Sequence, residues 1–471
     1  MLYFLRIVVV FSLLGNNVYG RRYEEVDVLI VGAGYSGLSA ALHFHRSNIT
    51  NFVVLEAEDD ICGRVKEIKF AGVTLPYGAG WIHHTEKDHI IQRLALKYKL
   101  KTRVDDYSYK NVLFRDAANG SMYPQQMIKS KFADIHTKMR TMDTIIENRI
   151  KNGRSDVDLK TGLRMAGWKI KSNLERAIEY FMFDFENGIE PDVISASAYS
   201  STGTGNDSIV TDTRGYSYPI RQEILPIRNK IETKTEVKSI TRVPRLKNKY
   251  RVITANNKIY LTKHVLITVS SGVLQAGNIK IHPALPIWKT QALDMAPMSH
   301  YCKIILRFSK QFWDSDEFIL LATSSRGKYS HWQNFNRPNL VPGKHILLGT
   351  LTGDFCHDHQ KKTDEEVKKE IYKVLKNVYP QASMPIEMVR NKWSLNPHFM
   401  GAYSYQVTGI TESDHAALKH PVDQSLWFAG EYANGWYFGY THGAFASGWK
   451  TAGDIMKCMK GVCPPLKPIS W

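Results

Sequence analysis

The sequence predicts an α/β fold, and three observations between residues 26 and 56 carry this prediction. Residues 26–31 form a short apolar run rich in β-branched side chains, which is typical of a strand buried on both faces. The glycine motif GAGYSG follows at residues 32–37, and the small and straight-chain residues after it predict a helix. A second apolar run, residues 52–55, delivers Glu56 about 20 residues beyond the last glycine, where a carboxylate can accept hydrogen bonds from a ribose. In this order, the elements predict a Rossmann-like unit that binds a dinucleotide.

Each glycine of the motif has a separate physical task in such a unit. Gly32 permits the tight turn, Gly34 lets the backbone approach a pyrophosphate, and Gly37 lets the helix pack on the strand. Free N–H groups at the start of the helix, around Tyr35 and Ser36, are expected to face the phosphates together with the positive end of the helix dipole.

The N-terminus has the features of a secretory signal. A single basic residue precedes an apolar run at residues 7–14 and a small-residue exit at residues 15–20, a segment too short to span a bilayer. We therefore expect residues 1–20 to be a signal peptide and the mature protein to be secreted and to begin near Arg21; the alternative is a buried first strand. No later apolar run approaches 18 residues, so no membrane anchor is expected. Glycosylation sequons compatible with export begin at Asn48, Asn119 and Asn206.

Composition sets further bounds on the function. The chain has 471 residues with 43% hydrophobic residues, as expected of a globular protein with a large core, and its length suits either about three domains or two large ones. The net charge is +17, and basic residues concentrate between Arg214 and Lys263. We interpret them as a solvated basic face that favours weak association with an anionic extracellular matrix. Export argues against a nucleic-acid partner.

The five cysteines are too few and too scattered for a disulfide-built scaffold, and their spacing predicts no metal site. Only Cys458 and Cys463 are close in sequence. They form either a small terminal disulfide or two free thiols, and the sequence does not decide between these.

Motifs along the whole chain carry a family resemblance. They are DICGR at residues 60–64, GAGWIH at 78–83, VLITVSSGVL at 265–274, YCKI at 301–304, FAGE at 428–431 and GYTHGA at 439–444. Taken together, these motifs resemble the flavin-containing amine oxidases, and most closely the polyamine oxidases. The resemblance extends from about Val26 to Gly453, with the secreted plant enzymes closest in overall shape.

The resemblance implies FAD, held without a covalent bond because residues 431–440 contain no cysteine. It also implies two discontinuous domains. We expect residues 21–100, 210–295 and 415–471 to form the Rossmann-like FAD-binding domain. Residues 101–209 and 296–414 are expected to form an interleaved α+β substrate-binding domain on a mixed sheet.

The resemblance assigns cofactor contacts beyond the glycine motif. Arg64 can hold a phosphate through a forked pair of hydrogen bonds, and Glu431 can accept hydrogen bonds from ribose or ribitol hydroxyls. The family usually has a second glycine where this chain has Cys62, and a positive φ there would cost cysteine about 1 kcal/mol; we interpret the change as tolerated. The other expected cofactor contacts are Gly80, Trp81, Val237, Trp393, Gly430, Tyr440 and Thr441.

Lys303 is the expected catalytic residue. It matches the family lysine that holds a water near the flavin N5, and a lysine there would be buried with a lowered pKa; the alternative is a surface lysine on a sheet edge. Tyr440 and Tyr403 correspond to the aromatic pair that flanks the substrate. Tyr301 and Trp81 correspond to further walls of the tunnel. For Trp393 and Trp332, core packing is an equal alternative.

Carboxylates should select a substrate that carries several positive charges. Glu186 matches an acidic tunnel residue of the plant enzymes, whereas their second acidic position falls on His83. Histidine there resembles the animal enzymes, so we expect His83 to contact a substrate nitrogen as a neutral imidazole. The alternative is a partly exposed loop histidine.

The leading hypothesis is a secreted FAD-dependent polyamine oxidase. It would oxidise a secondary amine of spermine, spermidine or their acetylated forms with O2 to an aldehyde, a shorter amine and H2O2. One alternative is another flavin amine oxidase or an L-amino-acid oxidase, although no arginine falls at the aromatic positions to bind an α-carboxylate. The other is a non-catalytic secreted protein that binds nucleotide or matrix polyanions.

Overall fold

The computed structural model describes residues 17–18, 21–105, 110–202, 205–244 and 249–465. The expected signal peptide lies outside this range except for β1 (Asn17–Val18), which pairs with β2 (Arg21–Arg22). Arg245 and Lys247 of the basic run also lie outside it.

Neighbouring parallel strands form the core of the larger sheet. β3 (Glu24–Val31) pairs with β4 (Phe52–Leu55) on one side and with β14 (Ile259–Ile267) on the other. β21 (Leu426–Phe428) pairs with the second half of β14. The two strands expected around the glycine motif are therefore confirmed, and β4 has the predicted bounds. The sheet is completed by β11 (Ile231–Glu232), β12 (Val237–Arg242), β13 (Tyr250–Thr254) and β15 (Lys280–His282).

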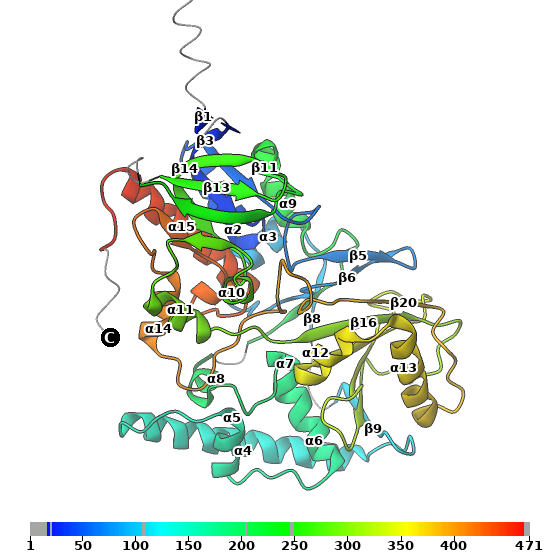
Figure 1. Ribbon diagram of the computed structural model, residues 1–471. Helices are drawn as coiled ribbons and strands as arrows, with labels where there is room; N and C mark the ends of the chain where they lie inside the picture. The colour runs from blue at the N-terminus through cyan, green and yellow to red at the C-terminus, as the bar shows by residue number, and fades with distance from the viewer. Residues whose placement is uncertain (1–16, 19–20, 106–109, 203–204, 245–248, 466–471) are drawn as a thin grey trace, which may run out of the picture.

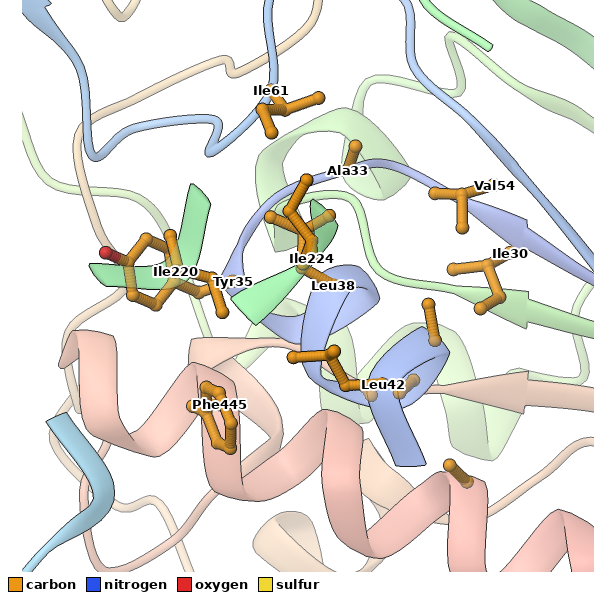
Figure 2. Packing of buried hydrophobic residues seen from close by; sticks show 14 of the residues in the cluster. Ile30, Ala33, Tyr35, Leu38, Leu42, Val54, Ile61, Ile220, Ile224 and Phe445 are labelled. Carbon is orange, nitrogen blue, oxygen red and sulfur yellow. The ribbon is translucent and has the colours of Figure 1, made fainter. Parts of the chain in front are cut away.

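Two helices pack closely on this parallel core, α2 (Tyr35–Arg46) and α15 (Thr441–Met459). A Cβ placed on Gly448 of α15 would lie 1.9 Å from the Ser36 carbonyl oxygen, and the Ser39 hydroxyl donates to the Phe445 carbonyl at 2.8 Å. Figure 2 shows the apolar side chains around α2, with those of the sheet and of Phe445 on α15. The close approach explains the run of small residues in α15. Around the same sheet lie α3 (Ile90–Lys97), α9 (Tyr218–Glu223) and η2 (Leu225–Lys230).

The second sheet is mixed, as predicted. Its order is β20 (Glu387–Arg390), β16 (Tyr301–Arg307), β19 (Ile346–Thr352), β18 (His331–Asn334), β17 (Phe318–Ala322) and β9 (Val112–Asp116), with only the last pair parallel.

Helices cover both faces of the mixed sheet. Alternate side chains of β17 pack against helices on opposite faces. Phe318 and Leu320 pack with α4 (Gln125–Lys151) and α6 (Asn173–Glu179), whereas Ile319 and Leu321 face the opposite side, with α13 (Asp364–Val378). The first face also carries α5 (Leu159–Met165), η1 (Tyr180–Asp184), α7 (Phe185–Asn187) and α8 (Ala196–Thr202), and the second carries α12 (Gly353–Lys361). Trp332 is buried in the second core, so core packing is its role.

The two sheets lie in different parts of the molecule (Figure 1). The strands of the larger sheet all fall in the ranges expected for the FAD-binding domain, and those of the mixed sheet in the ranges expected for the substrate-binding domain; the domain bounds themselves stay a prediction. Smaller connecting elements are β5 (Glu67–Phe70), β6 (Val73–Pro76), β7 (Trp81–Ile82), β8 (Thr102–Val104), β10 (Ser208–Val210), α10 (Ser271–Gln275), α11 (Ile287–Asp294), α14 (Glu412–Lys419) and η3 (Glu431–Ala433). Within the described residues, no helix has the length and hydropathy needed to cross a bilayer.

Two disulfides are present. Cys458 pairs with Cys463, the alternative that the sequence left open. Cys302 pairs with Cys356 across 54 residues and ties β16 to α12, a bond that sequence spacing did not indicate. The remaining thiol, Cys62, is buried, and burial raises its pKa, so it has the character of an inert structural cysteine.

Candidate functional site

A single large cavity of about 790 Å³ brings both parts of the molecule together. Its floor is the carboxyl edge of the parallel strands, where Val31, Leu55 and Thr268 follow or end β3, β4 and β14. Ligands of doubly wound sheets bind at this edge. The opposite wall includes Lys303 of β16 and Glu186 of α7.

The three motif glycines differ in the way the structure uses them. Gly32 has a φ of 103°, and a Cβ placed on it would lie 2.9 Å from the Thr268 hydroxyl. A Cβ on Gly37 would lie 2.0 Å from the Gly32 carbonyl oxygen, so Gly37 serves helix packing and does not line the cavity. A Cβ on Gly34 would meet nothing within 4 Å. It would occupy the cavity itself, where a phosphate is expected.

The start of α2 presents groups that suit phosphate. Ser36 is 3% exposed and lines the cavity, and its hydroxyl has no hydrogen-bond partner among the described residues. Tyr35 lines the cavity from the same turn. A buried hydroxyl beside a helix N-terminus suits an anionic group that would accept a hydrogen bond from it.

Carboxylates and one arginine lie where the sugar and phosphate groups are expected. Glu56 accepts hydrogen bonds from the backbone N–H groups of Ala33 (2.7 Å) and Glu58 (2.9 Å), yet burial raises its pKa. Arg64 donates through Nη1 to Glu431 at 2.8 Å and to the Ala402 carbonyl at 2.9 Å. The Glu431 carboxylate and the Ala402 carbonyl therefore hold the Arg64 guanidinium in place through the same nitrogen.

These observations fit a bound FAD. The glycine cradle, the unpaired Ser36 hydroxyl and the buried Glu56 carboxylate face one cavity whose volume is in the range of small-molecule sites. Gly80, Trp81, Val237, Trp393, Gly430, Glu431, Tyr440 and Thr441 line the same cavity.

The structure shows the backbone conformation of Cys62 and the surroundings of Trp393, which the sequence left open. Cys62 has a φ of 79°, so the position normally held by glycine does require the left-handed region. Trp393 both lines the cavity and packs edge-on against Tyr77 and Phe399, so the two interpretations of it are compatible.

Lys303 is buried in the centre of the site and is not a sheet-edge surface residue. Its side chain is 3% exposed, and β16 lies between β19 and β20. Nζ donates to the Gly78 carbonyl at 2.6 Å and lies 5.0 Å from the centre of the Trp81 ring. Burial lowers its pKa to about 7. The predicted burial and lowered pKa are confirmed, and its role with water stays a prediction.

Three phenols form an aromatic wall. Tyr403 donates to the Glu186 carbonyl at 2.9 Å, Tyr440 donates to the Glu186 carboxylate at 3.5 Å, and the rings of Tyr301 and Tyr403 lie 6.0 Å apart. Burial raises the pKa of all three phenols, so they are neutral at neutral pH. Trp81 closes the wall near Lys303, and its indole donates to Asp105 at 2.6 Å.

Opposite charges meet beside this wall. Glu186 is exposed to the cavity, where the surrounding protein still desolvates the carboxylate and raises its pKa. His83 lies 5.0 Å from the Tyr440 ring, and its Nδ1 lies 2.9 Å from Asp207. Burial disfavours the imidazolium, but Asp207 and Glu186 outweigh it and raise the pKa of His83. The two carboxylates therefore favour the charged form of His83 more than the sequence indicated, and its contact with a substrate nitrogen stays a prediction.

Asp207 is the site residue that sequence reasoning missed. It lines the cavity and bonds both His83 and the backbone N–H of His84 (3.2 Å). Its segment, residues 206–208, was interpreted only as a sequon. Strand β10 follows Asp207 directly and pairs with β7. This pairing brings the Asp207 carboxylate next to His83, the position where the plant enzymes have their second acidic residue.

Comparisons with known proteins agree with this geometry. Residues 35–456 match the sequence model of a family described as flavin containing amine oxidoreductase. The chain is 28% identical over 463 residues to polyamine oxidase 1 of Zea mays, covering 93% of this chain and 91% of that protein. It is 28% identical over 445 residues to polyamine oxidase 7 of Oryza sativa subsp. japonica, covering 89% and 93%. A solved structure of a putrescine oxidase with redesigned cofactor binding aligns with a TM-score of 0.73 at 18% identity, covering 92% of this chain and 99% of that chain, which shows a shared fold.

Proposed function

The chain belongs to the flavin-containing amine oxidoreductase family, and from this premise we propose that it is a secreted polyamine oxidase. The comparisons confirm the predicted family, the α/β fold, the FAD cofactor and the amine oxidase activity. The proposed reaction oxidises a secondary amine of spermine, spermidine or an acetylated form with O2. The products are an aldehyde, a shorter amine and H2O2.

The two carboxylates on one side of the aromatic wall carry the substrate proposal. Glu186 and Asp207 face the same cavity as Tyr440, and a polyamine brings several ammonium groups to such a surface. Aromatic faces suit both a partly desolvated cation and the methylene chain between cations. The curated relatives named above, which are polyamine oxidases, support the same class.

The protein's own residues orient the amine and control protons around it. A bound FAD would supply the acceptor for the hydride equivalent of the carbon next to the nitrogen. Tyr403 and Tyr440 flank the position of the substrate chain, and Glu186 holds them through two hydrogen bonds. With a pKa of about 7, the Lys303 amine can hold or release a proton at Nζ near neutral pH.

An amino-acid substrate fits the cavity less well. It needs a cation for the α-carboxylate, and apart from histidines the cations among the described lining residues are Arg64 and Lys303. Arg64 is paired with Glu431, and Lys303 is held by the Gly78 carbonyl. We therefore keep amines as the proposed substrate.

Secretion is part of the proposal. It is supported by the signal-like residues 1–20, the two disulfides, and the exposure of the sequon residues Asn48, Asn119 and Asn206. Expression in a secretory host should release the protein into the culture medium. Its N-terminus should lie near Arg21, and its mass should fall on glycosidase treatment. Retention of the intact chain inside the cell would contradict secretion.

Weak association with an anionic matrix is the remaining proposal on partners. The net charge of +17 supports it, but much of the basic run is paired with acids, as in Lys238–Glu236, Lys258–Glu232 and Lys263–Asp27. We therefore expect elution from immobilised heparin near physiological salt. Retention in high salt would indicate a specific site instead.

Product analysis tests the proposed function. With spermine, the enzyme should form one H2O2 per aldehyde, and Glu186→Gln should lower kcat/KM by roughly tenfold, the scale of a lost charged contact. Turnover of L-amino acids without turnover of any polyamine would overturn it.

A further inference from the structure

The long helix α4 lies at the edge of the molecule (Figure 1), and some of its residues line the same cavity as Glu186. Four residues of α4 line it, Phe132, His136, Met139 and Asp143. Their spacing of four, three and four residues places them on one face of the helix. This face borders the buried core, because Phe132 also packs in the core cluster that holds Ile135 and Met142. One stripe of α4 is therefore a wall of the cavity.

α8 supplies the facing side of this region, which we call the distal arm. The Ser200 hydroxyl of α8 donates to Asp143 Oδ1 at 2.6 Å, and this bond orients the carboxylate through one of its two oxygens. Tyr199 precedes Ser200, and its phenol feels the charges of both Asp143 and Glu186. Tyr199 also lines the cavity, so its phenol is near both carboxylates.

The arm favours a cation over an anion. Among the described lining residues, α4 contributes the carboxylate of Asp143 and the imidazole of His136, and burial together with the charge of Arg140 lowers the pKa of His136. The imidazole is accordingly neutral at neutral pH, so the charge offered by this wall is negative. Phe132 and Met139 add apolar surface that can contact methylene groups.

We propose that the distal arm binds the far ammonium group of a long polyamine, with Asp143 as its ionic partner. This inference rests on the proposed function and deepens it, because it names the part of the cavity that selects substrate length and terminal charge. Glu186 and Asp207 serve the charges near the aromatic wall, and Asp143 serves a charge farther along the chain.

The test compares two substrates in the loaded enzyme. Spermine has two free terminal ammonium groups, and N1,N12-diacetylspermine has none, whichever way it enters. Asp143→Asn keeps the shape and the acceptor for Ser200 but removes the charge. It should raise KM for spermine by about three- to tenfold and leave kcat within about twofold, because the contact is remote from the reacting carbon. KM for the diacetylated amine should not change.

Matched variants separate charge at this position from other effects. Asp134→Asn makes the same change at an exposed position of α4 that does not line the cavity, so it should leave both substrates unaffected. Asp143→Glu retains the charge and should keep KM for spermine closer to the parent value than Asp143→Asn does. Equal shifts for both substrates, or a spermine KM in Asp143→Asn equal to that in Asp134→Asn, would overturn the inference.

A binding measurement keeps the test independent of turnover. 1,12-Diaminododecane carries an ammonium at each end and no internal amine, and its binding can be followed through the absorbance of bound flavin. Its Kd should rise about three- to tenfold in Asp143→Asn and stay unchanged in Asp134→Asn. If the parent oxidises no polyamine, the proposed function fails, and this Kd still decides the subsite; an unchanged Kd would refute it.

Discussion

Replacing Lys303 by methionine separates a chemical role from a folding role. Methionine keeps the length and the apolar contacts of the side chain, including the approach to Trp81, and removes the amine that donates to the Gly78 carbonyl at 2.6 Å. Leaving that buried carbonyl unpaired costs about 1–3 kcal/mol. The loss is partly offset because the variant no longer buries an amine. We therefore expect Lys303→Met to fold and to bind FAD.

The expected loss is in rate and in pH dependence. Losing a positioned acid–base group slows its step roughly 10²-fold, or about 2.7 kcal/mol in the barrier. The pKa of Lys303 falls from about 10.5 to about 7 on folding, so the folded protein binds fewer protons than the unfolded one between these pH values. The contribution of Lys303 to the free energy of unfolding therefore rises with pH across this window. The full rise is on the order of 5 kcal/mol, and the methionine variant should lack it.

Stopped-flow half-reactions provide the assay. Flavin reduction by spermine and reoxidation by O2 are measured from pH 6 to 9 in the parent and in Lys303→Met, with the exposed Lys328→Met as control. The parent should show an ionisation near pH 7 in the slowed step that the variant lacks. If both rates in Lys303→Met stay within a few-fold of the parent, the assignment is refuted and Lys303 is a structural strand residue.

Four further outcomes follow from the site and the fold. Gly34→Val should fold but purify without yellow colour, because its Cβ meets no protein atom within 4 Å and its side chain enters the expected pyrophosphate position; stoichiometric FAD would contradict this. Acid precipitation should release all flavin into the supernatant, and colour in the pellet would disprove non-covalent binding. His83→Glu should shift relative kcat/KM toward the more highly charged amine over its acetylated form, and an unchanged ratio in active protein would leave His83 as a structural loop residue. Lys289→Met should lower stability by about 3–5 kcal/mol, measured by thermal unfolding, because the buried amine bonds three carbonyls at the end of α14; a shift below one degree would count against this.

The sequence predicted the parts of the fold in which local pattern and tertiary demand agree. The βαβ unit was readable because β3 and β4 are buried on both faces and because Gly32, Gly34 and Gly37 meet separate steric needs in consecutive turns. The mixed sheet around Lys303 followed from the family resemblance rather than from periodicity.

The missed features depend on contacts between distant segments. Asp207 sits in a sequon-like loop, and only the pairing of β10 with β7 brings it to His83. Cys302 and Cys356 are 54 residues apart, a separation that carries no sign of contact. Asp143 lies among polar residues on one face of α4. A helix face that lines a cavity and one that faces solvent have the same polar pattern, so the sequence did not distinguish them.

Anaerobic titration of the purified protein with spermine shows whether this cavity oxidises a polyamine. We expect an oxidised flavin spectrum that bleaches when spermine is added without O2 and returns when air is admitted, with one H2O2 formed per flavin reoxidised. A bound flavin that spermine, spermidine and their acetylated forms all leave oxidised would contradict the assignment of this cavity to polyamines.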